Sequence, residues 1–208
     1  MGARRTTRHR ENAAAARAET RRRLLVAAGE EFAEHGYHAA TVKGIAARAG
    51  VSVQTLYLAW TSKATLLRAH LEAALEGDGS TGDGSEYADT ISLAVADAVE
   101  SAEGDPVGIV EAFAQLFATI AERAAPAWKL YRDAAAVEPD IAEDWLTLQQ
   151  RRGETIAEFV ERLPAGALRA GVTPEAACDT VWVLASPATH ELLVGIGGVS
   201  ADDFERWL

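Results

Sequence analysis

The chain has 208 residues and a formal net charge of −11, with 49% hydrophobic and 25% charged residues, which is the balance of one or two ordinary folded domains. Its single cysteine, Cys178, excludes an intramolecular disulfide and a thiolate-rich metal site. The N-terminus is Arg-rich and lacks a secretory signal, and no apolar run approaches the ~18 residues of a membrane span, so we expect a cytoplasmic protein without a membrane partner.

The charge is distributed unevenly along the chain. Residues 1–70 carry 12 Lys/Arg against 5 Asp/Glu, a balance of +7, whereas residues 71–208 carry 8 against 26, a balance of −18. A basic first segment and an acidic second one favour a protein that binds phosphate at one end only. A disordered basic tail explains the same count, because 8 of the 12 basic residues are arginines before residue 24. The sequence motif that follows this segment has to decide between the two interpretations.

The first predicted elements are a basic arm and two helices. Residues 1–18 show no apolar periodicity and predict a disordered basic arm. Apolar residues at helical spacing begin at Leu24, and the helix is expected to end near Gly36, which suits a left-handed terminus. Thr41 is placed to cap a short second helix, and Gly50 breaks it.

A third helix is predicted between a cap at Ser52 and Trp60, and a fourth starts near Thr61 or Ser62 and runs to about Leu75. The stretch 77–85, GDGSTGDGS, has the composition of a flexible linker. The rest indicates helix, because Ala, Leu, Glu and Val dominate and no alternating strand pattern occurs. The predicted helices there cover 88–102, 106–122, 126–136, 139–163, 174–186, 188–195 and 201–208, and several begin near a proline.

The stretch TVKGIAARAGVSVQTLY, residues 41–57, meets the packing demands of a helix-turn-helix. Ala46 is small where the two helices approach closely, and Gly50 lies in the turn that needs a positive φ. By spacing alone, an αα-corner in a helical protein is the alternative. The apolar positions that would pack the pair on the first helix are Ile45, Val51 and Leu56.

The second helix of such a unit enters the major groove with its N-terminal residues facing base edges. Gln54 supplies an amide that can read adenine, and Thr55 supplies a hydroxyl for base or phosphate. Lys63, at the start of the fourth helix, adds a cation to a positive helix end, which favours phosphate binding. The predicted DNA-binding residues are Thr41, Ser52, Val53, Gln54, Thr55, Tyr57 and Lys63.

Residues 20–67 resemble the DNA-binding domain of the tetracycline-repressor (TetR) family, with consistent spacing across four helices. The resemblance implies a homodimeric, mostly repressing regulator whose helical C-terminal domain binds a small molecule and thereby lowers DNA affinity. Two residues depart from the family pattern, since Leu58 replaces the usual Tyr or His and Trp60 the usual Phe. The matching features are Leu24 to Tyr37 with its Phe-x-x-x-Gly-Tyr end, Thr41-x-x-x-Ile45-Ala46-x-x-Ala49-Gly50-Val51-Ser52, Thr55-Leu56-Tyr57 and Ser62-Lys63-x-x-Leu66-Leu67.

These observations predict an all-α chain in two domains. A three-helix helix-turn-helix DNA-binding domain occupies 19–66, behind the disordered arm, and a helical effector-binding and dimerisation domain occupies 67–208. Residues 179–208 resemble the last helices of family members, in which two long helices build a four-helix dimer interface.

Aromatic residues of the second domain lie on helices that would surround a bundle interior. Each alone is ordinary core, but together they favour a ligand pocket with aromatic walls. The excess of acids favours an apolar effector that is neutral or cationic. The predicted ligand-binding residues are Phe113, Phe117, Trp128, Tyr131, Trp145 and Trp182.

Residues 174–194 hold more apolar surface than a helix pair can bury within one monomer. Pro187 divides them into two segments that can pack as neighbours, and two copies would complete a bundle around a two-fold axis. The predicted dimer contacts are Val181, Leu184, Leu192 and Leu193.

The expected function is a repressor that a small effector releases from double-stranded operator DNA. No metal or cofactor is expected, because the histidines are scattered and His35 and His38 lack a carboxylate partner at ligand spacing. An enzyme is not expected either, since no acid/base pair or activated nucleophile is evident in the sequence. The alternative is a helical DNA-binding dimer that works without an effector.

Overall fold

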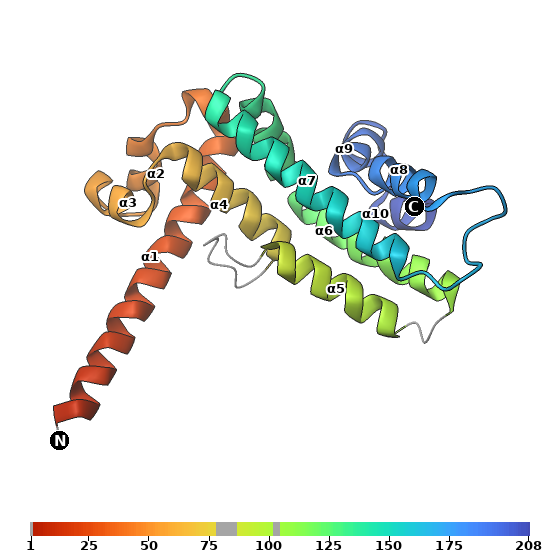
Figure 1. Ribbon diagram of the computed structural model, residues 1–208. Helices are drawn as coiled ribbons and strands as arrows, with labels where there is room; N and C mark the ends of the chain where they lie inside the picture. Colours follow the sequence, from red (N-terminus) through yellow and green to blue (C-terminus); the bar gives the residue numbers. More distant parts are fainter. Residues whose placement is uncertain (1, 78–86, 102–104) are drawn as a thin grey trace. The chain divides into compact units, whose positions relative to one another are not determined.

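The computed structural model describes residues 2–77, 87–101 and 105–208, and every regular element in these ranges is a helix, so the predicted all-α class is confirmed (Figure 1). The chain divides into two compact units. The first ends at Ala73, and the second holds Ala74 to Gly77 and the described residues from Tyr87 onward. The predicted linker, 77–85, lies outside the described residues except for Gly77.

Two helices of the first unit begin at the predicted caps, Thr41 and Ser52. The backbone N–H of Gly44 donates to Thr41 Oγ1 over 2.9 Å, and that of Thr55 donates to Ser52 Oγ over 3.0 Å. Ser62 caps the next helix reciprocally with Thr65. The bounds are α1 Gly2–Ala39, α2 Val42–Arg48, α3 Val53–Ala59 and α4 Lys63–Glu76, of which the last turn belongs to the second unit.

Helix α1 is longer than the sequence predicts. A disordered arm was expected over 1–18, but α1 begins at Gly2, and the alanines at 13–16 have the highest helix propensity of any residue. The expected helix end at Gly36 appears as a kink with φ 71° inside α1. A buried stripe at four-residue spacing, Leu24, Ala28 and Phe32, lies on α1, which packs against α2 and α3.

The second unit is a helical bundle in which α6 packs against α5, α7, α9 and α10, and α7 packs against α5 and α8. Its core includes Val95, Ile109, Phe159 and Val160. The bounds are α5 Tyr87–Ser101, α6 Pro106–Ala135, α7 Pro139–Glu161, α8 Pro174–Leu184, α9 Pro187–His190, the π-helical turn η1 Glu191–Ile196, and α10 Ala201–Trp207.

Four prolines are the first residues of helices, as predicted, but a fifth is not. Pro126 lies inside α6, so the predicted separate helices at 106–122 and 126–136 are one. A proline there forfeits a backbone hydrogen bond, yet Ala121, Ala124 and Trp128 around it are all buried. Packing of this continuous apolar face therefore outweighs the local preference for a break.

Within the described residues, no helix combines the length and apolar character that crossing a bilayer requires.

Candidate DNA-binding surface and ligand cavity

The turn between α2 and α3 is closed by backbone hydrogen bonds. The N–H of Gly50 donates to Ala47 O over 3.1 Å, and that of Val51 donates to Ala46 O over 3.0 Å. Gly50 has φ +65°, and nothing lies within 4 Å of the position that a Cβ would occupy. The turn therefore needs glycine for its backbone conformation and not for space.

Helix α3 has one buried and one exposed side. Leu56 is fully buried and anchors the helix, whereas Val53, Gln54 and Tyr57 are exposed. These are three of the predicted DNA contacts, and they share the solvent side of the helix. Leu58 is 83% exposed on the same helix.

The hydroxyl groups among the predicted DNA contacts also form hydrogen bonds at the starts of α2 and α3. Ser52 Oγ accepts the N–H of Thr55, and the two hydroxyls lie 2.8 Å apart. Thr41 is exposed, but its hydroxyl caps α2. Both hydroxyls can still bond a phosphate, because an oxygen that caps a helix keeps further hydrogen-bonding capacity.

Arg21 of α1 holds the C-terminal end of α3. Its Nη1 donates to Ala59 O over 3.1 Å, and its guanidinium carbon lies 3.8 Å from the ring centroid of Trp60. In the sequence Arg21 is one of eight arginines before residue 24, and nothing in that pattern predicts this contact.

A carboxylate is buried where α1 meets the start of α2. Glu31 is 6% exposed; its carboxylate accepts Arg48 Nε over 2.8 Å and the N–H of Thr41 over 3.4 Å. A Cβ on Gly44 would lie 2.1 Å from Glu31 Oε1. Glycine at this position therefore lets the carboxylate reach the N-terminus of α2, where the helix dipole also favours a negative charge.

Glu31 was not predicted, although the sequence carries a signal for it. It falls on the stripe of Leu24 and Ala28, where a charge must find a partner if it is buried. Arg48 bonds Glu34 of the next turn as well. Hydrogen bonding to Arg48 holds the pKa of Glu31 below its ordinary value.

Lys63, predicted to contact phosphate, forms hydrogen bonds within the protein in this structure. Its Nζ donates to Tyr37 O over 2.7 Å and to Ala40 O over 3.2 Å, and it lies 4.3 Å from the centroid of the Tyr37 ring. Lys63 thus binds carbonyls at the end of α1, where a positive charge is favourable. In this arrangement it joins α4 to α1.

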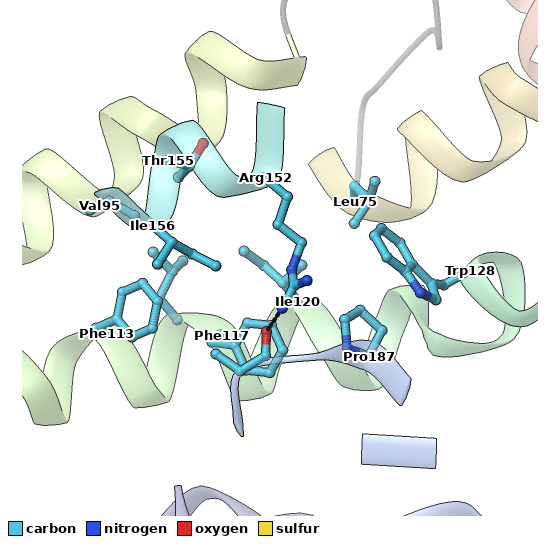
Figure 2. Close-up of a pocket in the computed structure, with 12 residues that line it drawn as sticks. Leu75, Val95, Phe113, Phe117, Ile120, Trp128, Arg152, Thr155, Ile156 and Pro187 are labelled. Atoms are coloured by element: carbon cyan, nitrogen blue, oxygen red, sulfur yellow. Dashed lines mark hydrogen bonds between the residues drawn. The ribbon is translucent and has the colours of Figure 1, made fainter. Parts of the chain in front are cut away.

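A cavity of about 70 Å³ lies within the second unit (Figure 2). Three of the predicted ligand residues, Phe113, Phe117 and Trp128, line it. Among the described residues of its wall, Arg152 has the one charged side chain. The lining is Leu75, Val95, Phe113, Leu116, Phe117, Ile120, Trp128, Arg152, Thr155, Ile156, Ala185 and Pro187.

The other three predicted ligand residues do not line this cavity. Tyr131 is buried and donates its hydroxyl to Asp144. The Trp145 ring packs edge-on against Trp128 at 4.8 Å between centroids. Trp182 lies on α8 with its ring 4.2 Å from the Arg152 guanidinium carbon. These rings support the wall without facing the cavity.

A second cavity of about 500 Å³ shares Phe113 and Ala185 with the first. The Phe113 ring stacks on Phe159 with 4.0 Å between centroids, so one aromatic side chain borders both spaces. The other residues of the second cavity are Val110, Ala114, Val160, Leu163, Ala167, Leu168, Arg169, Val172, Ala177, Thr180, Val181, Leu184 and Leu208.

The predicted dimer contacts fall into two groups. Val181 and Leu184 line the larger cavity and are half-buried, so they face their own bundle. Leu192 is 62% exposed, and Leu193 is half-buried. The apolar residues that point outward along α8 and η1 are Trp182, Val183, Leu192 and Ile196.

No group of three or more His, Cys, Asp or Glu side chains suited to a metal occurs in the described part of the chain. His35 does have carboxylates nearby, because Glu31 lies 3.8 Å from its Nδ1 and Glu34 lies 3.8 Å from its Nε2, but the two carboxylates face different ring nitrogens. Cys178 packs against the core of the second unit, and burial raises the pKa of its thiol. It therefore serves as a small packing residue.

Comparison with known proteins gives a family for the first unit. The family model of bacterial regulatory proteins, tetR family, matches residues 24–70. The HTH-type transcriptional activator FasR of Mycolicibacterium smegmatis is 50% identical over 56 residues. That match covers 27% of this chain and 26% of FasR, so it spans about a quarter of either protein.

Solved structures are similar in fold over most of the chain. A transcriptional regulator from Pseudomonas aeruginosa has a TM-score of 0.66 at 17% identity, covering 89% of this chain and 85% of its own. A TetR-family regulator from Mesorhizobium loti has a TM-score of 0.63 at 21% identity, covering 91% of each chain. The likeness therefore extends to the fold of both units.

The first prediction concerns Glu31. Because its pKa in the folded protein lies below the ordinary 4.5, its contribution to the free energy of unfolding is complete above about pH 4.5 and is lost as the pH falls through the lowered pKa. Glu31→Gln should therefore lower the Tm most at neutral pH, and the difference from wild type should close in acid. Thermal denaturation by circular dichroism measures this difference. The exposed Glu30, 3.9 Å from Arg48, is the control, and a gap independent of pH would contradict the assignment.

The second prediction concerns Lys63. Because its ammonium bonds the end of α1, Lys63→Ala should destabilise the domain by about 1–3 kcal/mol, as expected for hydrogen bonds to a charged group. Urea denaturation measures the loss. Lys43, an exposed lysine on α2, is the matched control and should leave stability unchanged. Equal stability of the two variants would contradict this structural role and would favour Lys63 as a phosphate contact.

Proposed function

The chain belongs to the TetR family of bacterial regulators, and we propose that it binds operator DNA as a homodimer and represses transcription until a small effector releases it. One observation carries the DNA-binding part. Helix α3 is anchored by Leu56 and capped by Ser52, and it leaves Val53, Gln54 and Tyr57 exposed. The amide of Gln54 can pair bidentately with adenine in the major groove.

Charge supports the same surface. Residues 1–70 carry a balance of +7 within a chain of −11, so phosphate is attracted to the first unit and repelled by the rest. All eight arginines before residue 24 lie on α1, the helix that packs against α2 and α3. Their positive charge therefore belongs to the same unit as the recognition helix and adds to its attraction for the duplex backbone.

Dimer formation is supported by apolar surface near the chain's end. Helix α8 has no fully buried residue, and Leu192 and Ile196 on η1 are 62% and 72% exposed. Such side chains are typical of an obligate interface, which resembles a core cut in half. A two-fold dimer can place its recognition helices ~34 Å apart, as successive faces of the major groove require.

Effector release is supported by the two cavities of the second unit. A ligand bound there changes operator affinity only to the extent that it prefers one arrangement of the dimer over another. A second candidate function, activation, is favoured by the relative from M. smegmatis, which is a transcriptional activator. Once an operator is known, transcription from it in vitro, with and without this protein, distinguishes repression from activation.

The experiment that tests the proposal is selection of bound sequences from random duplex DNA. A near-palindromic site with affinity that falls steeply as salt rises is expected from phosphate contacts on both subunits. Salt-independent binding, or a complex with one protein copy, would overturn it. An effector-independent DNA-binding dimer would select a site as well, but no small molecule would raise its Tm.

The third prediction concerns base reading. Gln54→Ala should change the preferred base at one position of each half-site and cost about 1–3 kcal/mol on the wild-type operator. Repeating the selection with the variant measures the change. The control is Lys43→Ala, which removes an exposed positive charge on α2 and should leave the preferred bases unchanged. An unaltered preference for Gln54→Ala would place base recognition on other residues.

The fourth prediction concerns the interface. Leu192→Glu would bury an unpaired charge if η1 lies between subunits, so a folded monomer that no longer binds the operator at nanomolar concentration is expected. Analytical ultracentrifugation gives the mass, and circular dichroism checks the helices. Leu146→Glu, at an exposed leucine on α7, is the control. A dimer with unchanged operator affinity would move the interface to α7.

A further inference from the structure

We propose that the effector is an amphipathic anion, whose acidic head group binds Arg152 and whose apolar chain fills the larger cavity. The proposal rests on the effector-binding function proposed above. It differs from the expectation of a neutral or cationic effector, which was based on the acidity of the whole segment.

The charge that a ligand meets is that of the cavity wall. Of the described residues that line the smaller cavity, none is acidic, and Arg152 is the one charged group. The larger cavity likewise has a single charged residue in its described lining, Arg169. Both cavities are otherwise apolar apart from Thr155 and Thr180. A cationic head group would therefore be desolvated without an acidic partner in the wall, whereas an anion has one.

Arg152 is suited to a carboxylate. It is half-buried, and its planar guanidinium presents several N–H donors in a fork that matches the two carboxylate oxygens. In Figure 2 its side chain extends from α7 toward Phe117, Ile120 and Pro187, on the side of the cavity. A volume of about 70 Å³ exceeds several times the ~10–15 Å³ that one water needs. The smaller cavity therefore holds a head group but no long chain.

The larger cavity provides the space for the chain. Its volume of about 500 Å³ is more than three times the ~150 Å³ of a cavity that binds benzene. Phe113 and Ala185 belong to both linings, so the two spaces are neighbours, and the proposal requires the chain of the ligand to pass between them beside Phe113. The head and the chain of one ligand would then occupy the two spaces.

Arg152 also links the cavity to α8. Its Nη2 donates to Ala185 O over 3.0 Å and to the carbonyl of Trp182. Both carbonyls belong to the C-terminal end of α8, which leads through α9 to the exposed leucine of η1. A carboxylate forms stronger hydrogen bonds with a guanidinium than neutral carbonyls do. Ligand binding should therefore weaken the contact between Arg152 and α8 and so alter the proposed interface.

The test uses the full-length protein and three probes with the same chain: decanoate, decan-1-ol and decylammonium. Isothermal titration calorimetry at neutral pH gives their affinities. Decanoate should bind about tenfold to a hundredfold more tightly than decan-1-ol, as a charged hydrogen bond implies, and decylammonium should bind most weakly. Equal affinities, or a preference for the ammonium, would overturn the proposal.

Variants locate the head group. Arg152→Gln should abolish the preference for decanoate over decan-1-ol, whereas Arg169→Gln should preserve it. If the glutamine variant does not fold, Arg152→Lys replaces it, and its preference should be reduced because lysine lacks the bidentate fork. The assignment would be contradicted if Arg169→Gln abolished the preference for decanoate, or if Arg152→Lys left that preference unchanged.

A further variant locates the chain. Ala114, which lines the larger cavity only, is changed to leucine. Ala114→Leu should weaken decanoate more than hexanoate, because only the longer probe reaches the narrowed space. An equal loss for both would place the chain elsewhere.

A gel shift on the selected operator separates this inference from the proposed function. Decanoate should lower operator affinity of the wild type but not of Arg152→Gln. If the protein binds its operator and no probe binds the protein, only the effector class is wrong. If no operator is bound at all, the proposed function itself fails.

Discussion

Several helices of this protein end on a cation supplied from a distant part of the chain. The last carbonyls of a helix have no partner within it, and together they carry a partial negative charge. Lys63 binds those at the end of α1, and Arg21 binds one at the end of α3. In the second unit, Arg123 donates to Ala74 O and Leu75 O at the end of α4, and Arg152 donates to the end of α8. Each contact fixes where one helix stops relative to another.

This use of basic residues limits what charge counting can predict. Lys63, Arg21 and Arg48 all contribute to the positive balance of the first unit, yet the structure commits each of them to an internal partner. Arg48 is bound by Glu31 and Glu34. The first unit still attracts phosphate although these residues have internal partners, because the long-range electrostatic potential depends on the net charge of the unit. The individual residues that touch the duplex cannot be read from the same count.

What the sequence predicted well was local. The caps Thr41 and Ser52, the turn at Gly50 and the start of α4 are each determined by residues within a few positions, and all agree with the structure. What it missed depended on contacts across the chain. Glu31 is stabilised by a residue 17 positions away, and α6 continues through Pro126 because the surrounding helices cover its apolar face.

The candidate sites show the same limit. Aromatic composition pointed to Phe113, Phe117 and Trp128 in the cavity wall, but it could not tell them from Tyr131 and the other rings that lie behind it. Arg152 was not identified, because the adjacent Arg151 and Arg152 on an amphipathic helix are typical of solvated surface. Apolar content likewise indicated that the end of the chain forms an interface, but it could not tell which side chains are exposed. Val181 lines the larger cavity, whereas Leu192 is exposed.

Gly44 in the first turn of α2 and Gly50 in the turn between α2 and α3 should tolerate different replacements. At Gly50 the obstacle is the backbone angle, with open space beyond it, so asparagine, which visits left-handed conformations readily, should be accepted better than alanine. At Gly44 the obstacle is the Glu31 carboxylate, so alanine should be accepted better than anything larger. Shortening Glu31 would relieve the second obstacle and leave the first untouched. Among natural variants of this domain, residue 44 should therefore covary with residue 31, while residue 50 should vary independently of both.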